Sequence, residues 1–110
     1  MTLPADRLRA PDLYRCIDRV EEAFRKGDDE VEVVRGGRLR LVSTVEASIK
    51  QLAGVVVHLR GPYYDEAKQL IDELNRARIS RSVDLPKVFE ELRSIISAWD
   101  TARQARRRAA

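Results

Sequence analysis

Few residues of this 110-residue chain have the types and spacing that catalysis or metal binding requires. Cys16 and His58 are its single cysteine and single histidine, whereas a structural zinc site needs about four such ligands at close spacing. Cys16 falls beside an apolar stripe, which is typical of a small buried residue. No Glu-x-x-His pair is present that could hold a di-iron centre. We therefore expect no catalytic residue, no metal and no cofactor.

Acidic pairs and a glycine pair are the other features that could do chemistry. Glu21-Glu22, Asp28-Asp29 and Glu90-Glu91 fall on predicted helix faces or at a helix end. Acid–base catalysis needs carboxylates in a cleft that separates their pKa values, so these pairs indicate solvated surfaces. Gly36-Gly37 lacks the flanking residues of a phosphate-binding loop and lies within a predicted hairpin. The chain is therefore expected not to be an enzyme.

Two groups of arginines are candidate contacts to nucleic acid or to an acidic partner. One group, around the glycine pair, is Arg35, Arg38 and Arg40. The other, near the C-terminus, is Arg103, Arg106, Arg107 and Arg108. The last ten residues hold four of the 21 basic side chains and no acid, so residues 1–100 carry 17 basic against 18 acidic. The pI of 9.3 therefore reflects the C-terminal segment. A charged hairpin turn and arginines that compensate a helix dipole are the structural alternatives.

The elements that position these residues begin with a helix over residues 11–26. Leu13, Ile17, Val20 and Phe24 recur at spacings of 4, 3 and 4, as on one helix face. Pro11 suits the first helical position, and Gly27 suits a C-terminal cap.

A β-hairpin is predicted over residues 30–43, where β-branched residues alternate with charges around Gly36-Gly37. A two-residue loop would mix apolar and charged side chains on each face. A three-residue loop over residues 35–37 pairs Val31 with Leu41 and Val33 with Leu39. This register places apolar and charged side chains on opposite faces, so we prefer it. An isolated hairpin is marginal in water, so its apolar face is expected to pack on the helices.

A second helix is predicted from Thr44 to Arg60. Ser43 and Glu46 have the spacing of a capping box, and an apolar stripe runs from Val45 to Leu59 before Gly61-Pro62. A short buried strand over residues 55–59 is the alternative, with Gly54 as the break, and the unbroken stripe favours the helix.

Two further helices follow. Pro62 can open the third, whose apolar face includes Leu70 and Leu74 and which ends at Ala77. Asp84 can cap the fourth, which runs to Ala102 and then into the arginines. The prediction is a mainly α, single-domain antiparallel bundle of four helices over residues 1–102, with the hairpin inserted between the first two, and a short basic tail over residues 103–110.

The composition narrows the expected function. Charged residues make up 35% of the chain, above the usual ~25%, and no window is long and apolar enough to span a membrane. One cysteine permits no internal disulfide, so a cytoplasmic location is expected. Sustained apolar stripes favour a non-enzymatic interaction or assembly module with a protein partner or a second copy, with Trp99 as a candidate interface residue. A small nucleic-acid-binding regulator is the alternative.

Overall fold

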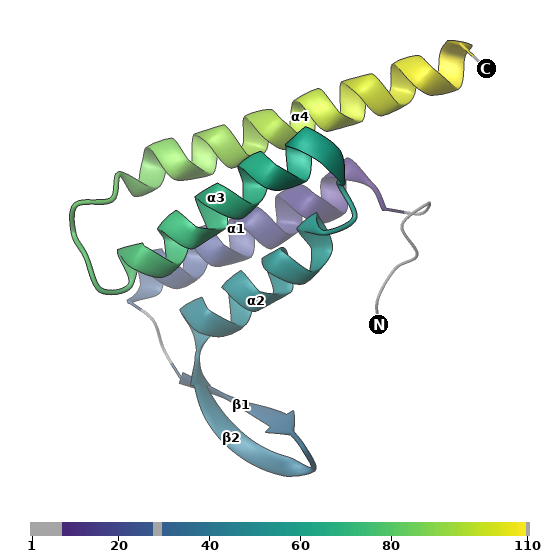
Figure 1. Cartoon of the computed structure of the whole chain (residues 1–110). Coiled ribbons are helices and arrows are strands. Elements are labelled where there is room, and N and C mark those ends of the chain that lie inside the picture. Colours follow the sequence, from purple (N-terminus) through teal and green to yellow (C-terminus); the bar gives the residue numbers. More distant parts are fainter. Residues whose placement is uncertain (1–7, 28–29, 110) are drawn as a thin grey trace.

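The computed structural model describes residues 8–27 and 30–109. Four helices, α1 (Ala10–Lys26), α2 (Thr44–Val56), α3 (Gly61–Ala77) and α4 (Leu85–Ala109), form a bundle. The strands β1 (Glu30–Arg35) and β2 (Arg38–Ser43) form a hairpin between α1 and α2 (Figure 1). The predicted order of elements and the mainly helical fold class are confirmed. The acidic pair Asp28-Asp29 and residues 1–7 of the predicted domain lie outside the described residues.

The N-terminal half of the bundle follows the expected local rules. Pro11 lies in the first turn of α1, and Gly27 ends it in a left-handed conformation with φ 89°. The Glu46 N–H donates to Ser43 Oγ at 3.0 Å, which confirms the predicted cap of α2.

The end of α2 differs from the prediction, because the helix stops at Val56 rather than Arg60. Residues 57–59 form a tight turn in which the N–H groups of His58 and Leu59 donate to the carbonyls three residues earlier. The alternative strand over residues 55–59 is wrong. Leu59 is nevertheless buried, so the apolar stripe continues through a turn that is no longer α-helical.

The fourth helix is longer than its apolar stripe. The Lys87 N–H donates to Asp84 Oδ1 at 3.3 Å, which confirms the predicted cap. From there α4 continues without interruption through the arginines to Ala109. Residues 103–109, which include the C-terminal arginines, therefore belong to the helix. The last turns of α4 extend beyond the other helices (Figure 1).

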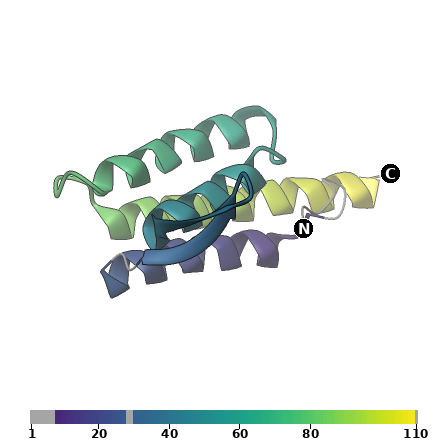
Figure 2. The ribbon, with the colours of Figure 1, turned by 90° about the horizontal axis from the view of Figure 1, so that it is seen from below.

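The helices pack as an antiparallel ring in which each contacts its sequence neighbours, and α1 also contacts α4. Figure 2 shows α1 and α3 on opposite sides, with α2 and α4 between them. The Nη2 of Arg93 lies 2.8 Å from both Asp18 Oδ1 and Glu21 Oε1, and joins α4 to α1. Phe24 and Phe89 meet edge to face across the same helix pair, with ring centroids 6.2 Å apart.

One apolar core lies inside this ring. Leu13, Ile17, Leu52, Leu74 and Leu92 are among its fully buried side chains. None of the buried core residues belongs to the described part of the hairpin, so the helices complete the core together with Leu8 and Leu59 from the segments beside them.

The hairpin register corrects two predictions. The loop has two residues, Gly36 and Gly37, and Val33 pairs with Arg40 while Glu32 pairs with Leu41. Both glycines have positive φ, at 57° and 75°, as a two-residue type I′ turn requires. The three-residue loop was preferred because it would separate apolar from charged side chains on the two faces. In the observed register Val33 and Val42 are half-buried against α2, whereas Val34, Leu39 and Leu41 stay exposed. The two-glycine turn, rather than burial of one whole face, therefore accounts for the register.

Candidate functional site

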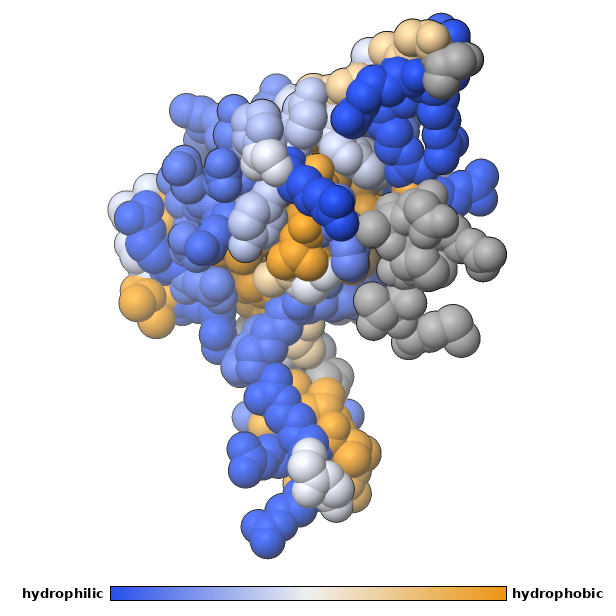
Figure 3. Space-filling view, turned by 45° about the vertical axis from the view of Figure 1, so that its right-hand side comes forward, coloured by the Kyte–Doolittle hydropathy of each residue, from blue (hydrophilic) through white to orange (hydrophobic). Residues whose placement is uncertain are grey.

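The hairpin has two faces of different chemistry. Because paired residues in an antiparallel ladder point to the same side, Val34 and its partner Leu39 share a face with Leu41. We call these three side chains the apolar face. They are 70%, 70% and 64% exposed, respectively. Figure 3 shows the hairpin as an arm below the body, with hydrophobic side chains gathered along one side and hydrophilic ones along the other.

The apolar face is the main apolar surface that the described residues leave open to solvent. Their only other exposed large hydrophobic residues are Val57 and Ile79, which lie apart in the two interhelical turns. Scattered apolar side chains are normal on protein surfaces, but a contiguous group on a projecting element is typical of an interaction site.

The opposite face of the arm is basic towards its tip. Arg35 pairs directly with Arg38, and Arg40 lies on the same side through its pairing with Val33. We call these three arginines the basic face. Within the part of the chain that the structure describes, none of them forms an ion pair. Two like charges directly opposite each other disfavour the hairpin, so an anionic partner would stabilise it.

The arm is held at its base by α2. Val33 and Val42 are half-buried and line a small hollow with Ala47 of α2. Because these valines share a face with the arginines, Leu39 and Leu41 lie on the face turned away from the helix, whereas Val34 also borders the hollow. Glu46 also pairs with Arg78, at 3.8 Å between Oε2 and Nη2, which links α2 to the end of α3.

The C-terminal arginines lie at the other end of the bundle. Arg103 donates to the Leu8 carbonyl and covers the Trp99 ring, with its guanidinium carbon 4.9 Å from the ring centroid. Arg106, Arg107 and Arg108 are exposed on the protruding end of α4. Since the hairpin leaves the opposite end, the two predicted basic groups do not form one surface (Figure 1).

Trp99, the candidate interface residue, lies in the core. Its side chain is only 5% exposed and is covered further by Arg103. It is therefore unavailable to a partner in this structure, and the exposed apolar contacts lie on the hairpin.

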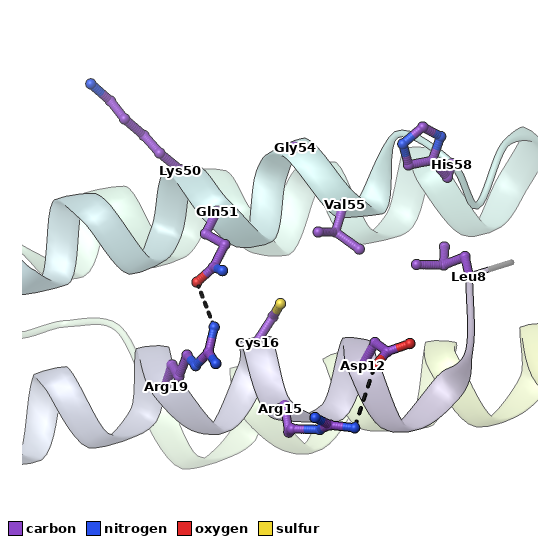
Figure 4. A pocket seen from close by; sticks show the side chains of 10 residues that line it. All are labelled: Leu8, Asp12, Arg15, Cys16, Arg19, Lys50, Gln51, Gly54, Val55 and His58. Atoms are coloured by element: carbon purple, nitrogen blue, oxygen red, sulfur yellow. Dashed lines mark hydrogen bonds and ion pairs between the residues drawn. The ribbon is translucent and has the colours of Figure 1, made fainter. Parts of the chain in front are cut away.

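A pocket between α1 and α2 brings Cys16 and His58 together, although they are distant in sequence. It has a volume of about 450 Å³, and Leu8 and Val55 contribute apolar walls. Figure 4 shows the Cys16 thiol pointing towards α2, while the His58 ring points away from it. Arg19 donates to Gln51 at 3.2 Å across the pocket. Antiparallel packing creates this pocket, and no sequence motif signals it.

The pocket does not assemble a nucleophile and its base. No hydrogen bond joins Cys16 to His58 in the described structure. Burial raises the pKa of the Cys16 thiol, which outweighs the lowering by Arg19. A thiol with a raised pKa is a weak nucleophile at neutral pH because little of it is thiolate.

Residues 8–27 and 30–109 contain no group of three or more His, Cys, Asp or Glu side chains that could hold a metal ion. No helix within those ranges is long and apolar enough to cross a membrane.

Comparison with known proteins adds no assignment. No protein-family model, curated protein or solved structure matches the chain. The hairpin, with its apolar and basic faces, is thus the candidate functional site on physical grounds.

Proposed function

We propose that this chain is a non-enzymatic interaction module that binds a protein partner through the apolar face of its hairpin. The observation that carries the proposal is the exposure of Val34, Leu39 and Leu41 by 70%, 70% and 64% on one side of a projecting arm. Burying a large apolar side chain gains up to about 1.5–3 kcal/mol, so a surface that gathers three of them favours association.

The hairpin contributes none of the described core residues, and this supports the proposal. The helices bury their own apolar stripes without help from the arm, so the hairpin is not needed to close the core. A two-stranded hairpin alone is marginally stable in water, and a partner on its apolar face would stabilise it. The same proposal places the protein in the cytoplasm, in keeping with its single cysteine.

Site-specific photo-crosslinking tests the proposal. A photoreactive amino acid replaces Leu41 in one variant and Ile79 in another, in cells that express the protein. Ile79 is the matched control because it is apolar and 91% exposed but lies outside the hairpin. We expect a protein adduct from position 41 only. Equal adducts at both positions, or none at position 41, would contradict the proposal.

Nucleic-acid binding is a second candidate function, favoured by the basic face. Arg35, Arg38 and Arg40 lie together without ion-pair partners in the described structure, and phosphates would neutralise them. We expect fluorescence anisotropy to detect duplex DNA or single-stranded RNA binding that weakens steeply with salt. Replacing the three arginines with glutamine should abolish it. An absence of binding at low salt rules this candidate out.

A further inference from the structure

We propose that the partner of the hairpin is a basic amphipathic helix that lies along the two strands, with its apolar stripe on the apolar face and lysine or arginine beside the stripe. This inference rests on the proposed function and names the class of partner that the same surface binds. The apolar side chains alone would accept many helices. The choice therefore rests on the charges around Leu39 and Leu41 and on the dimensions of the hairpin.

Two glutamates lie on the same side of the hairpin as the apolar face. Glu32 pairs directly with Leu41, and Glu30 precedes Glu32 by two residues on β1, so both carboxylates are on that side. Both glutamates are exposed, and neither forms an ion pair within the part of the chain that the structure describes. The surface therefore combines exposed apolar side chains with two negative charges that no described cation compensates.

The arginines of the hairpin are on the other side from these glutamates. Arg40 pairs with Val33, and Arg35 pairs with Arg38, so all three arginines project away from the apolar face. A cationic partner on the apolar face therefore meets carboxylates, whereas an anionic partner there meets like charges. Complementary charge favours association, and like charge excludes the wrong partner. The charge of this surface thus selects a basic partner.

The apolar and acidic side chains form two neighbouring rows. Leu39 and Leu41 lie on β2, whereas the two glutamates lie on β1 in the half of the arm next to the body. Neighbouring strands are about 4.8 Å apart, so a partner needs apolar and cationic side chains side by side over a similar distance. An amphipathic helix meets this need, because charged residues flank its apolar stripe.

The dimensions of the hairpin also match a helix. Each strand has six residues, which extend over about 20 Å, the length of about 13 helical residues. Leu39 and Leu41 are two residues apart on one strand, or about 7 Å, and helical residues i and i+4 are separated by about 6 Å along the axis. A strand added at an edge of the hairpin would extend the sheet and leave both leucines uncovered. A helix on the face buries them.

Selection of peptides on the purified full chain tests this inference. The probe is a phage-displayed library of random peptides of about 16 residues, long enough for a helix that spans the strands. We expect peptides that bind about 100-fold more weakly to Leu39→Ser/Leu41→Ser but bind normally to Ile79→Ser, the matched control. These hairpin-dependent peptides should place apolar residues at helical spacing beside lysine or arginine. Hairpin-dependent peptides without an excess of basic residues, or a selection that yields none, would overturn the inference.

Neutralisation of the glutamates tests the charge directly. Glu30→Gln/Glu32→Gln should bind the hairpin-dependent peptides about 10-fold more weakly at low salt, and the difference should shrink as salt screens the charges. Glu90→Gln/Glu91→Gln is the matched control, because it removes the same charge from exposed positions of α4. Fluorescence anisotropy measures the affinities. Equal affinities of the two variants would contradict a contact at Glu30 and Glu32 and overturn the inference.

Other occupants of the surface give different results. A dimer in sedimentation equilibrium that dissociates in Leu39→Ser/Leu41→Ser would place a second copy there and overturn the inference. In cells, a position-41 adduct that persists undiminished in Glu30→Gln/Glu32→Gln would also overturn it, yet would leave the proposed function standing. The absence of any adduct at position 41 contradicts both. The two proposals therefore fail in distinguishable ways.

Discussion

At the scale of single residues, Cys16 shows how burial removes a reactive group from use. The residue is only 7% exposed within the α1–α2 packing. Burial raises its pKa above the ordinary 9.0, while Arg19 lowers it, Asp12 raises it and Arg15 lowers it. The sequence predicted a buried small residue from the apolar stripe, but not the pocket beside it, because that depends on how α1 and α2 pack.

The raised pKa has a consequence for stability at high pH. The unfolded chain releases the thiol proton at a lower pH than the folded chain. The free energy of unfolding therefore keeps its full value below about pH 9 and decreases above that pH, as the thiol of the unfolded chain ionises. We expect the unmodified protein to lose stability relative to Cys16→Ala as the pH rises from about 8 to about 10. Denaturant unfolding at several pH values measures the free energy of unfolding of both proteins. If the two free energies change with pH in parallel, the raised pKa of Cys16 is contradicted.

Arg60 is a residue whose backbone is strained. It has φ 60° and ψ 164°, a region that glycine adopts readily and other residues avoid. Arg60→Gly should raise the free energy of unfolding by about 1 kcal/mol, because relief of strain exceeds the added entropy of the unfolded chain. Gly61→Ala, at φ 58°, is the matched control and should lower it. Denaturant titration compares them, and a destabilised Arg60→Gly would count against this strain.

At the scale of elements, periodicity predicted the helices well because their stripes match the core. The stripe of α1 from Leu13 to Val20 is fully buried, as are Val45 and Leu52 of α2. The hairpin was harder to predict, because its register follows from the two-glycine turn and not from the separation of apolar and charged side chains. Nothing local in its sequence reveals that Leu39 and Leu41 remain exposed to solvent. The apolar face of the hairpin could therefore be recognised only from the arrangement of the elements.

The two-residue turn can be checked by NMR. The observed register brings the Hα atoms of Glu32 and Leu41 together across the strands, as it does those of Val34 and Leu39. We expect cross-strand Hα–Hα NOEs for both pairs. NOEs from Val33 to Leu39 in their place would restore the three-residue loop. Gly37→Ala, at φ 75°, should weaken these NOEs by straining the turn, whereas the helix signals should persist.

At the scale of the whole molecule, the residues that form the core and the residues exposed for contact lie in different elements. The ring of helices buries Trp99 and the apolar stripes, while the arm presents apolar and basic faces at one end and α4 presents arginines at the other. The predicted bundle was therefore right about the body. Trp99, predicted as a candidate interface residue, is buried in the core beneath Arg103.

This separation means that the apolar face should be dispensable for folding. Exposed positions away from special features usually change stability by about 0.5 kcal/mol or less, whereas truncation of a buried leucine costs about 2–5 kcal/mol. Leu52→Ala, at a fully buried site, provides the reference for a core substitution.

The free energy of global unfolding of Leu39→Ser/Leu41→Ser, measured by denaturant titration at low protein concentration, tests the central claim most directly. If the apolar face is reserved for a partner, the value should lie within about 0.5 kcal/mol of the unmodified chain. A loss of about 2 kcal/mol or more, comparable with Leu52→Ala, would show that these leucines serve the fold and would contradict the proposed interaction surface.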